Sequence, residues 1–321
     1  MAFIGNRIFI TLITLFLVSV FSFGAFHLIP GDAAVISLGI DADDEQIARL
    51  RSEWGLDKSI PEQFLSWLGK FLSGNLGNSA RFRGASITGM IRDRLPVTSS
   101  LALLSLFFIL LIATPVSLLP MKKKSGFPDF IVNTLTAINI SMPGFFLGVI
   151  FIWIFGLIFK LFSPGAYIDY RTDYFGFLRY LVLPALAIAL PNAAILVKFL
   201  RGSIYREWDK DYVRTARSKG ANRKRTLRKH VIKNACLPAL VMLGMIIGEI
   251  FSGSIVMEQV FSIPGIGRLL IASITSRDYL MIETLVIYIA FVVILANTLV
   301  DIAIQIIDPR IRLQREENNE Q

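Results

Sequence analysis

Two carboxylates lie inside long apolar segments of the sequence, Glu249 within residues 237–257 and Asp301 within residues 285–307. A charged side chain in a membrane interior is costly, so such acids mark solute or ion paths, or bond to neighbouring helices. Glu249 therefore either lines a path for a cationic solute or is hydrogen-bonded between helices. For Asp301, with Asn297 one turn earlier, we favour a role in helix packing over contact with solute.

Pro143 is a further candidate for the solute path, because it interrupts the apolar segment 130–159. Proline removes a helical hydrogen bond and clashes with the preceding turn, so it bends or breaks a helix. In a membrane the freed carbonyl must find another partner. We therefore expect a break at Pro143, either packed between helices or lining a pore.

Residue patterns typical of catalysis or cofactor binding are missing from the sequence. It has no Gly-x-x-x-x-Gly-Lys-Ser/Thr phosphate loop, so we expect no ATP hydrolysis by this chain. The two histidines, His27 and His230, are too far apart to argue for a metal cluster, and the single cysteine, Cys236, cannot form an internal disulfide. The chain is predicted to be neither an enzyme nor the holder of a cofactor or metal.

The composition is that of a membrane protein. Hydrophobic residues make up 54% of the 321 residues and charged residues only 18%, with a mean hydropathy of +0.60. This is too apolar for an ordinary soluble domain of this size. A membrane-crossing helix needs about 20 apolar residues. Six segments satisfy this or approach it: 8–28, 97–119, 130–159, 180–197, 237–257 and 285–307.

The predicted fold is therefore an all-α, polytopic membrane protein with six transmembrane helices. We interpret residues 1–29 as an uncleaved signal anchor, since the apolar run is longer than that of a typical secretory signal. With six spans, both termini and the loops 120–129 and 198–236 share one face. That face carries 20 of the 33 lysines and arginines, which predicts that it is cytoplasmic. Topology thus explains the net charge of +9, and nucleic-acid binding becomes unnecessary.

The outer loop, residues 30–96, is long enough for a small extracytoplasmic domain. We expect one helix capped by Asp43 or Asp44 and running toward Trp54, and a second beginning at Pro61 and rich in aromatic residues. These helices either lie on the membrane surface or form a docking platform for an external partner.

The basic loop 203–236 is expected to form one helix over 203–219 and another over 223–233. Gly220 between them can supply the positive φ of a helix C-terminus, and Pro238 should open the fifth span near its first turn. Such a hairpin is either a solvated, lipid-facing loop or a lever that transmits movement from a cytoplasmic partner.

Residues 211–220 (DYVRTARSKG) and 228–238 (RKHVIKNACLP) resemble the coupling motif, or EAA loop, of ABC importer permeases of the dipeptide/oligopeptide/nickel branch. The resemblance implies docking into a cleft of an ATPase subunit, although Arg214 stands where the general motif has glutamate. The residues it assigns to this contact are Asp211, Tyr212, Arg214, Thr215, Ala216, Arg217, Gly220, Ala221, Asn234, Leu237 and Pro238.

The resemblance extends over nearly the whole chain. Further segments that resemble the branch are 27–32, 55–58, 67–69, 74–79, 95–96, 141–145, 183–185, 258–268, 277–279 and 308–310, with Pro61, Gln63, Asn297 and Asp301. It implies a type I ABC importer permease fold, with a permease core over 97–310 and a cytoplasmic tail over 311–321. It implies as partners a second homologous permease, two cytoplasmic ATPases that bind ATP and magnesium, and an extracytoplasmic substrate-binding protein, in the bacterial inner membrane.

The expected function is therefore half of an ATP-driven import pathway for di- or oligopeptides. A permease for nickel or another small solute is the nearest alternative. An ion-coupled secondary transporter would use Glu249 and Asp301 instead of an ATPase, but it should show inverted repeats, and none is visible. A third hypothesis is a membrane-anchored receptor or scaffold that binds anionic lipid through its basic loop.

Overall fold

The computed structural model describes residues 2–27, 34–35, 43–79, 82, 84–119 and 126–307, and all statements below concern these residues. Four sequence features lie outside them: most of the 27–32 segment, Lys122–Lys124, the 308–310 segment and the tail 311–321.

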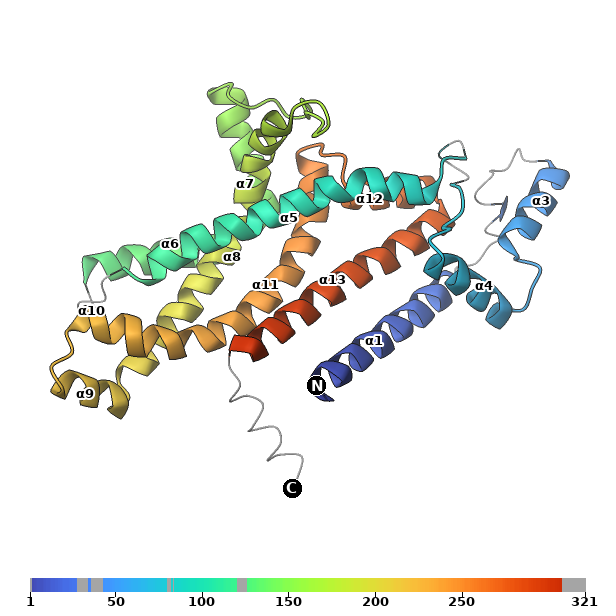
Figure 1. The fold of residues 1–321 in the computed structure, drawn as a ribbon. Coiled ribbons are helices and arrows are strands. Elements are labelled where there is room, and N and C mark those ends of the chain that lie inside the picture. The colour runs from blue at the N-terminus through green and yellow to red at the C-terminus, as the bar shows by residue number, and fades with distance from the viewer. Residues whose placement is uncertain are drawn as a thin grey trace. The chain divides into compact units, whose positions relative to one another are not determined.

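The described chain is helical, as the sequence predicts. Its helices are α1 (Ala2–His27), α3 (Asp44–Trp54), α4 (Ile60–Leu72), α5 (Ile87–Ser117), α6 (Phe127–Ser141), α7 (Gly144–Phe151), η1 (Ile152–Ile158), α8 (Tyr174–Trp208), α9 (Asp211–Ser218), α10 (Arg223–Thr226), η2 (Leu227–Val231), α11 (Ile232–Val260), α12 (Ile266–Ser276) and α13 (Tyr279–Ile307) (Figure 1). The β structure recorded in the described part is a single isolated bridge between Asn78 and Ser86.

The six predicted spans correspond to five long apolar helices and one bent pair of helices. Five helices are long and apolar enough to cross a bilayer: 5–25, 87–117, 174–208, 223–260 and 279–302. The sixth candidate is the pair 127–141 and 144–158, which is bent by 98°. Pro143, with φ of −60° and ψ of 139°, is the extended N-cap of α7 at this bend, so the expected break at Pro143 is confirmed.

Several helices are longer than their apolar segments. The helix of the second span begins at Ile87, so the expected domain boundary at residues 96 and 97 falls within α5. The helix of the fourth span runs from Tyr174 to Trp208 with Pro184 and Pro191 inside it, because polar turns at both ends extend the apolar centre.

The chain divides into two compact units, and each is described by itself. The first comprises residues 1–99 and 263–295. Its core consists of the apolar side chains Ile87, Ile91, Ile266, Leu269, Met281 and Leu285. A buried hydrogen bond from the Ser79 hydroxyl to Asp278 joins the 74–79 segment to the turn before α13. Two of the segments that resemble the permease branch are therefore in contact.

The two expected outer-loop helices are confirmed as α3 and α4. Glu62, in the first turn of α4, accepts a hydrogen bond from the backbone N–H of Ser59 at 3.2 Å, which stabilises the start of the helix. The aromatic face of α4 packs on α1, where the ring centroids of Phe23 and Phe64 are 5.3 Å apart. Gln63 also bonds to the His27 ring at 3.0 Å. The aromatic side chains of α4 thus contact α1, while Leu65 and Leu72 of the same helix stay 65% and 77% exposed.

The second unit comprises residues 100–262 and 296–321, with α8 at its centre. This helix packs against α6, α7 and α11, and it is the most buried of the candidate spans. Small residues allow the close approach: a Cβ at Gly144 would lie 3.3 Å from the Ala187 carbonyl oxygen, and one at Gly148 would lie 3.1 Å from the Phe261 ring. Such small-residue contacts are typical of helix packing in membranes.

Candidate functional site

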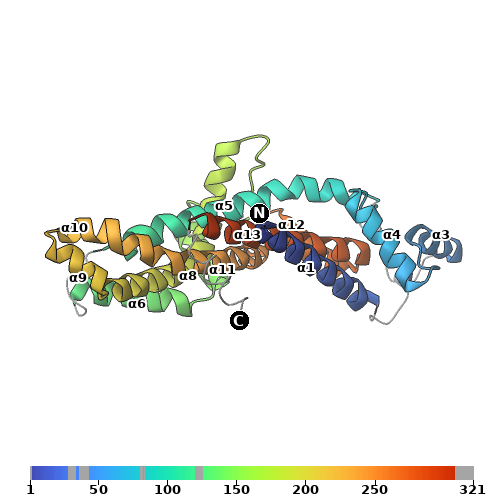
Figure 2. The same cartoon turned by 60° about the horizontal axis from the view of Figure 1, so that its bottom comes forward.

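The basic loop forms a compact hairpin. α9 and α10 lie together at the end of the second unit where α8 stops and α11 begins (Figure 2). The prediction of one helix over 203–219 is wrong, because α8 ends at Trp208 and Lys210 is extended, with ψ of 149°. The break turns the chain so that Val213, only 1% exposed, is buried beneath α9. Burial of one apolar side chain thus outweighs the helix propensity of a polar segment.

Tyr212 connects α9 to both long helices. Its hydroxyl donates a hydrogen bond to Glu207 Oε2 at 2.6 Å, and Asn234 Nδ2 donates one to the same hydroxyl oxygen at 3.1 Å. Glu207 belongs to the last turn of α8 and Asn234 to the first turn of α11. One side chain therefore ties the short helix to the end of one span and the start of the next.

The Tyr212 hydroxyl remains protonated at neutral pH. Burial, followed by the hydrogen bond to the Glu207 carboxylate, raises the pKa of Tyr212 above its ordinary value. A raised folded-state pKa means that this contribution to stability is complete at neutral pH and is lost only as the pH rises through that pKa. The network is therefore intact over the whole physiological range.

The opposite side of α9 is open and polar. Asp211, Arg214, Thr215 and Arg217 are exposed, and Ala216 is half-buried. Arg214 Nη1 is 3.6 Å from Asp211 Oδ1, with the two side chains 74% and 96% exposed. A surface ion pair of this kind contributes little to stability. The exposed face therefore presents both charges to whatever docks there.

A glycine turn reverses the chain between α9 and α10. Gly220 has φ of +87°, its N–H donates to the Arg217 carbonyl at 2.9 Å, and the N–H of Ala221 donates to the Ala216 carbonyl at 3.2 Å. This is a Schellman-type helix end, which requires a residue tolerant of the left-handed conformation. The expected role of Gly220 is confirmed. Asn222 then caps α10 by accepting from the N–H of Arg225 at 2.8 Å.

The expected role of Pro238 is wrong. Pro238 lies inside α11, which begins at Ile232 and follows α10 and η2 without a break in the helix. The missing N–H withdraws a helical partner from the Asn234 carbonyl, yet the helix continues because its apolar face packs on α8. Leu237 is half-buried and Pro238 is exposed. Both lie on the helix that carries Asn234.

Two polar contacts in and near the hairpin are not predicted by the sequence patterns. Glu207 bonds to Lys210 Nζ at 2.5 Å as well as to Tyr212. An acidic side chain in the last turn of a helix is unfavourable, because the helix dipole is negative at that end. Glu207 at this position is therefore a sequence signal for a compensating contact. The second contact is the buried ion pair between Arg201 and Asp129, residues far apart in the chain. No local pattern indicates this pairing.

The candidate path residues occupy different environments, and no contact of this structure brings all four together. Pro143 is exposed at the bend. Glu249 is exposed on α11, and it makes no hydrogen bond or ion pair with the described residues. Asn297 lies where α13 approaches α11, since a Cβ at Gly248 would be 4.0 Å from Asn297 Nδ2. Asp301, one turn further, is half-buried.

The side chains of Trp67 and Trp153 do not form a binding site together. Trp67 packs with Phe23, Phe64 and Phe71 and has a structural role, whereas Trp153 is 56% exposed. Among the described residues, no group of three or more His, Cys, Asp or Glu side chains is arranged to hold a metal ion.

Removal of the Tyr212 hydroxyl should loosen α9 while leaving the fold intact. Tyr212→Phe deletes the hydrogen bonds with Glu207 and Asn234 and the longer contact with the His230 carbonyl at 3.5 Å, at a cost of about 1–3 kcal/mol. Amide hydrogen exchange of residues 211–218 should therefore accelerate at least about fivefold. Tyr174→Phe is the matched control, because Tyr174 is exposed and makes no recorded hydroxyl bond. Unchanged exchange in Tyr212→Phe would show that the network does not hold the helix.

Comparison with known proteins places the hairpin within a matched domain. Residues 113–313 match the family model described as binding-protein-dependent transport system inner membrane component. Residues 1–102 match the model for the N-terminal part of such membrane components.

Individual relatives match along almost their entire length. The chain is 33% identical over 310 residues to a probable peptide ABC transporter permease protein of Sinorhizobium fredii, covering 97% of this chain and 99% of the relative. It is 33% identical over 312 residues to a putative peptide permease protein of Brucella ovis, covering 96% and 98%. It is 30% identical over 312 residues to the oligopeptide transport system permease protein AppB of Bacillus subtilis, covering 97% and 99%.

Proposed function

The chain belongs to the family of binding-protein-dependent transport system inner membrane components, and from this premise we propose its function. It is the transmembrane permease subunit of an ATP-driven ABC importer. It forms half of a pathway for di- or oligopeptides delivered by an extracytoplasmic binding protein. The observation that carries the proposal is the near full-length similarity to relatives named as peptide and oligopeptide permeases.

Energy for transport comes from partner subunits in this proposal. The printed sequence contains no phosphate-loop motif, so two cytoplasmic ATPases bind ATP and magnesium and supply the work. A second homologous permease completes the channel. The chain is an integral membrane protein, and we place it in the bacterial inner membrane with both termini in the cytoplasm, on the strength of its lysine and arginine distribution.

The hairpin is the coupling element. The exposed face of α9, with Asp211, Arg214, Thr215 and Arg217, docks on an ATPase, while Tyr212 holds the helix to both spans. Because α9 is bonded to α8 through Glu207 and to α11 through Asn234, a displacement of α9 moves both helices together. Closure of the ATPase pair is thereby converted into alternating access of the pore.

Reconstitution with the partners tests this function. In proteoliposomes that contain the complete transporter, uptake of a radiolabelled dipeptide or oligopeptide should require ATP, magnesium and the binding protein. It should persist when ionophores abolish all ion gradients. Uptake that continues without ATP but stops with the ionophores would overturn the proposal in favour of an ion-coupled transporter.

Glu249 faces the solute path in this proposal. The carboxylate is exposed on an apolar helix and is not paired within the described chain, so a purely structural role lacks a partner here. Glu249→Gln should lower uptake of lysine-containing peptides several-fold relative to neutral peptides, because one attractive charge is worth about 1 kcal/mol. Competition between a dilysine and a dialanine peptide measures the ratio. An unchanged ratio would remove Glu249 from the path.

A further inference from the structure

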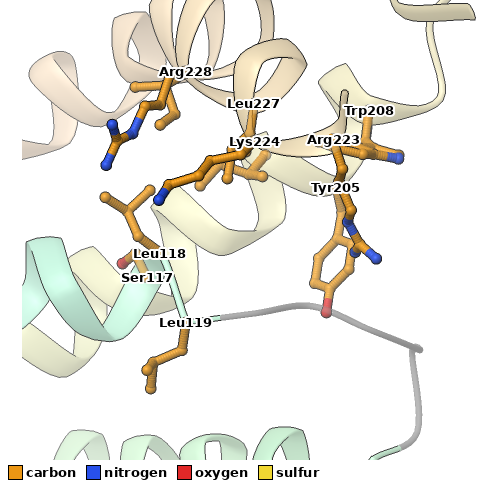
Figure 3. Close-up of a pocket in the computed structure, with 11 residues that line it drawn as sticks. Ser117, Leu118, Leu119, Tyr205, Trp208, Arg223, Lys224, Leu227 and Arg228 are labelled. Atoms are coloured by element: carbon orange, nitrogen blue, oxygen red, sulfur yellow. The ribbon is translucent and has the colours of Figure 1, made fainter. Parts of the chain in front are cut away.

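A pocket of about 440 Å³ lies beside the hairpin, within the second unit (Figure 3). Three segments surround it: residues 117–119 at the end of α5, residues 204–208 at the end of α8, and residues 223–232. Its volume is within the range of pockets that hold small ligands. All three segments are ends of helices that are long and apolar enough to cross a membrane.

The pocket combines an apolar lining with a basic rim. Leu118, Leu119, Ile204, Leu227 and Ile232 supply apolar surface, and the charged side chains that line it, Arg223, Lys224 and Arg228, are all cationic. Figure 3 shows the Lys224 side chain extending toward Leu118. Among the described residues, none that lines the pocket is acidic. The surface is therefore complementary to a ligand with an anionic head and an apolar tail.

The three cations differ in how they are held. The Arg223 guanidinium lies over the Trp208 ring, 5.4 Å from its centroid, which fixes its orientation. Lys224 and Arg228 are exposed and make no hydrogen bond or ion pair with the rest of the described chain. Two of the three charges are thus available to a ligand without the loss of an internal contact.

We propose that this pocket binds an anionic phospholipid, with the phosphate between Lys224 and Arg228 and an acyl chain against Leu118 and Leu227. Basic pockets between membrane helices at the headgroup level are suited to such lipids. The inference requires only that these helices cross a bilayer. It does not depend on which solute is transported.

Photocrosslinking in lipid nanodiscs tests the site. The full chain is placed in phosphatidylcholine nanodiscs with a trace of phosphatidylglycerol that carries a diazirine in its acyl chain, and labelled peptides are mapped by mass spectrometry. Segments 117–119 and 223–232 should be labelled by this probe and far less by the matching phosphatidylcholine probe. The paired substitution Lys224→Gln with Arg228→Gln should reduce the labelling about 30-fold, and each single substitution about fivefold.

The matched control is Arg225→Gln with Lys229→Gln. It removes the same charge from the same segment, but neither side chain lines the pocket, so labelling should stay close to that of the unmodified chain. Equal labelling by the two lipid probes, or equal loss in the two paired variants, would overturn the proposal. Displacement of the probe by excess inorganic phosphate, or by ATPase subunits in the assembled transporter, would also overturn it and would assign the pocket to a free anion or to the protein partner.

Discussion

Gly220→Asp abolishes ATP-driven peptide uptake while leaving the chain inserted in the membrane. Gly220 has φ of +87°, a conformation that costs a residue with a Cβ about 1–3 kcal/mol. The new carboxylate also stands at the C-terminal end of α9, where the helix dipole disfavours negative charge. Together these terms amount to about 1.3–4 kcal/mol, and 1.4 kcal/mol corresponds to a tenfold change, so uptake should fall about tenfold or more.

Two variants separate coupling from general damage. Gly84→Asp introduces the same side chain at another glycine of positive φ, +71°, which like Gly220 has nothing within 4 Å of an added Cβ. Because Gly84 is outside the hairpin, uptake should be retained. Gly220→Asn has a similar backbone cost but adds no charge, so it should retain more uptake than Gly220→Asp and isolates the effect of the carboxylate. Normal uptake in a well-expressed Gly220→Asp transporter would contradict the assignment of the hairpin to coupling.

Local signals in the sequence were sufficient for much of the fold. Runs of about 20 apolar residues identify the spans, because a helix is the simplest way to satisfy the backbone in lipid. The break at Pro143 and the turn at Gly220 follow from the backbone chemistry of single residues. The α4 helix follows from Pro61 and the aromatic spacing after it.

Two predictions of helix boundaries are wrong because tertiary contacts override the local helix preference. The segment 203–219 has helical propensity throughout, but burial of Val213 favours a turn at Asp209 and Lys210. Pro238 is typical of a helix start, yet packing against α8 carries α11 through it. For Pro238 the deciding partner, α8, is distant in the sequence.

In the candidate site, too, local motifs were predictable from the sequence and contacts between helices were not. The motif residues Tyr212 and Asn234 were found in the sequence by resemblance, but their shared hydrogen bond and the partner Glu207 were not. Interactions between helices depend on how the spans pack, and a single sequence carries no direct record of that. The buried pair Asp129 and Arg201 is the clearest example, because the two residues are 72 positions apart in the sequence.

Asp129→Asn should strongly destabilise the second unit. Asp129 begins α6, Arg201 lies on α8, and their side chains are only 10% and 6% exposed. Arg201 Nη1 also donates to the Val116 carbonyl of α5 at 3.2 Å, so the guanidinium joins three helices. Removing the carboxylate charge leaves Arg201 buried without its counter-ion, which costs about 3–5 kcal/mol. SDS titration in mixed micelles, followed by circular dichroism, measures this loss.

Two further variants distinguish the buried charge from the loss of a carboxylate as such. Asp129→Asn combined with Arg201→Gln removes both charges, and it should recover most of the lost stability because no unpaired ion remains. Glu45→Gln breaks a comparably close pair, Arg49 and Glu45 at 2.6 Å, whose side chains are 78% and 70% exposed. Solvent screens that pair, so its loss should change stability little. If Asp129→Asn proved as mild as Glu45→Gln, the contact between α6 and α8 would not depend on this ion pair.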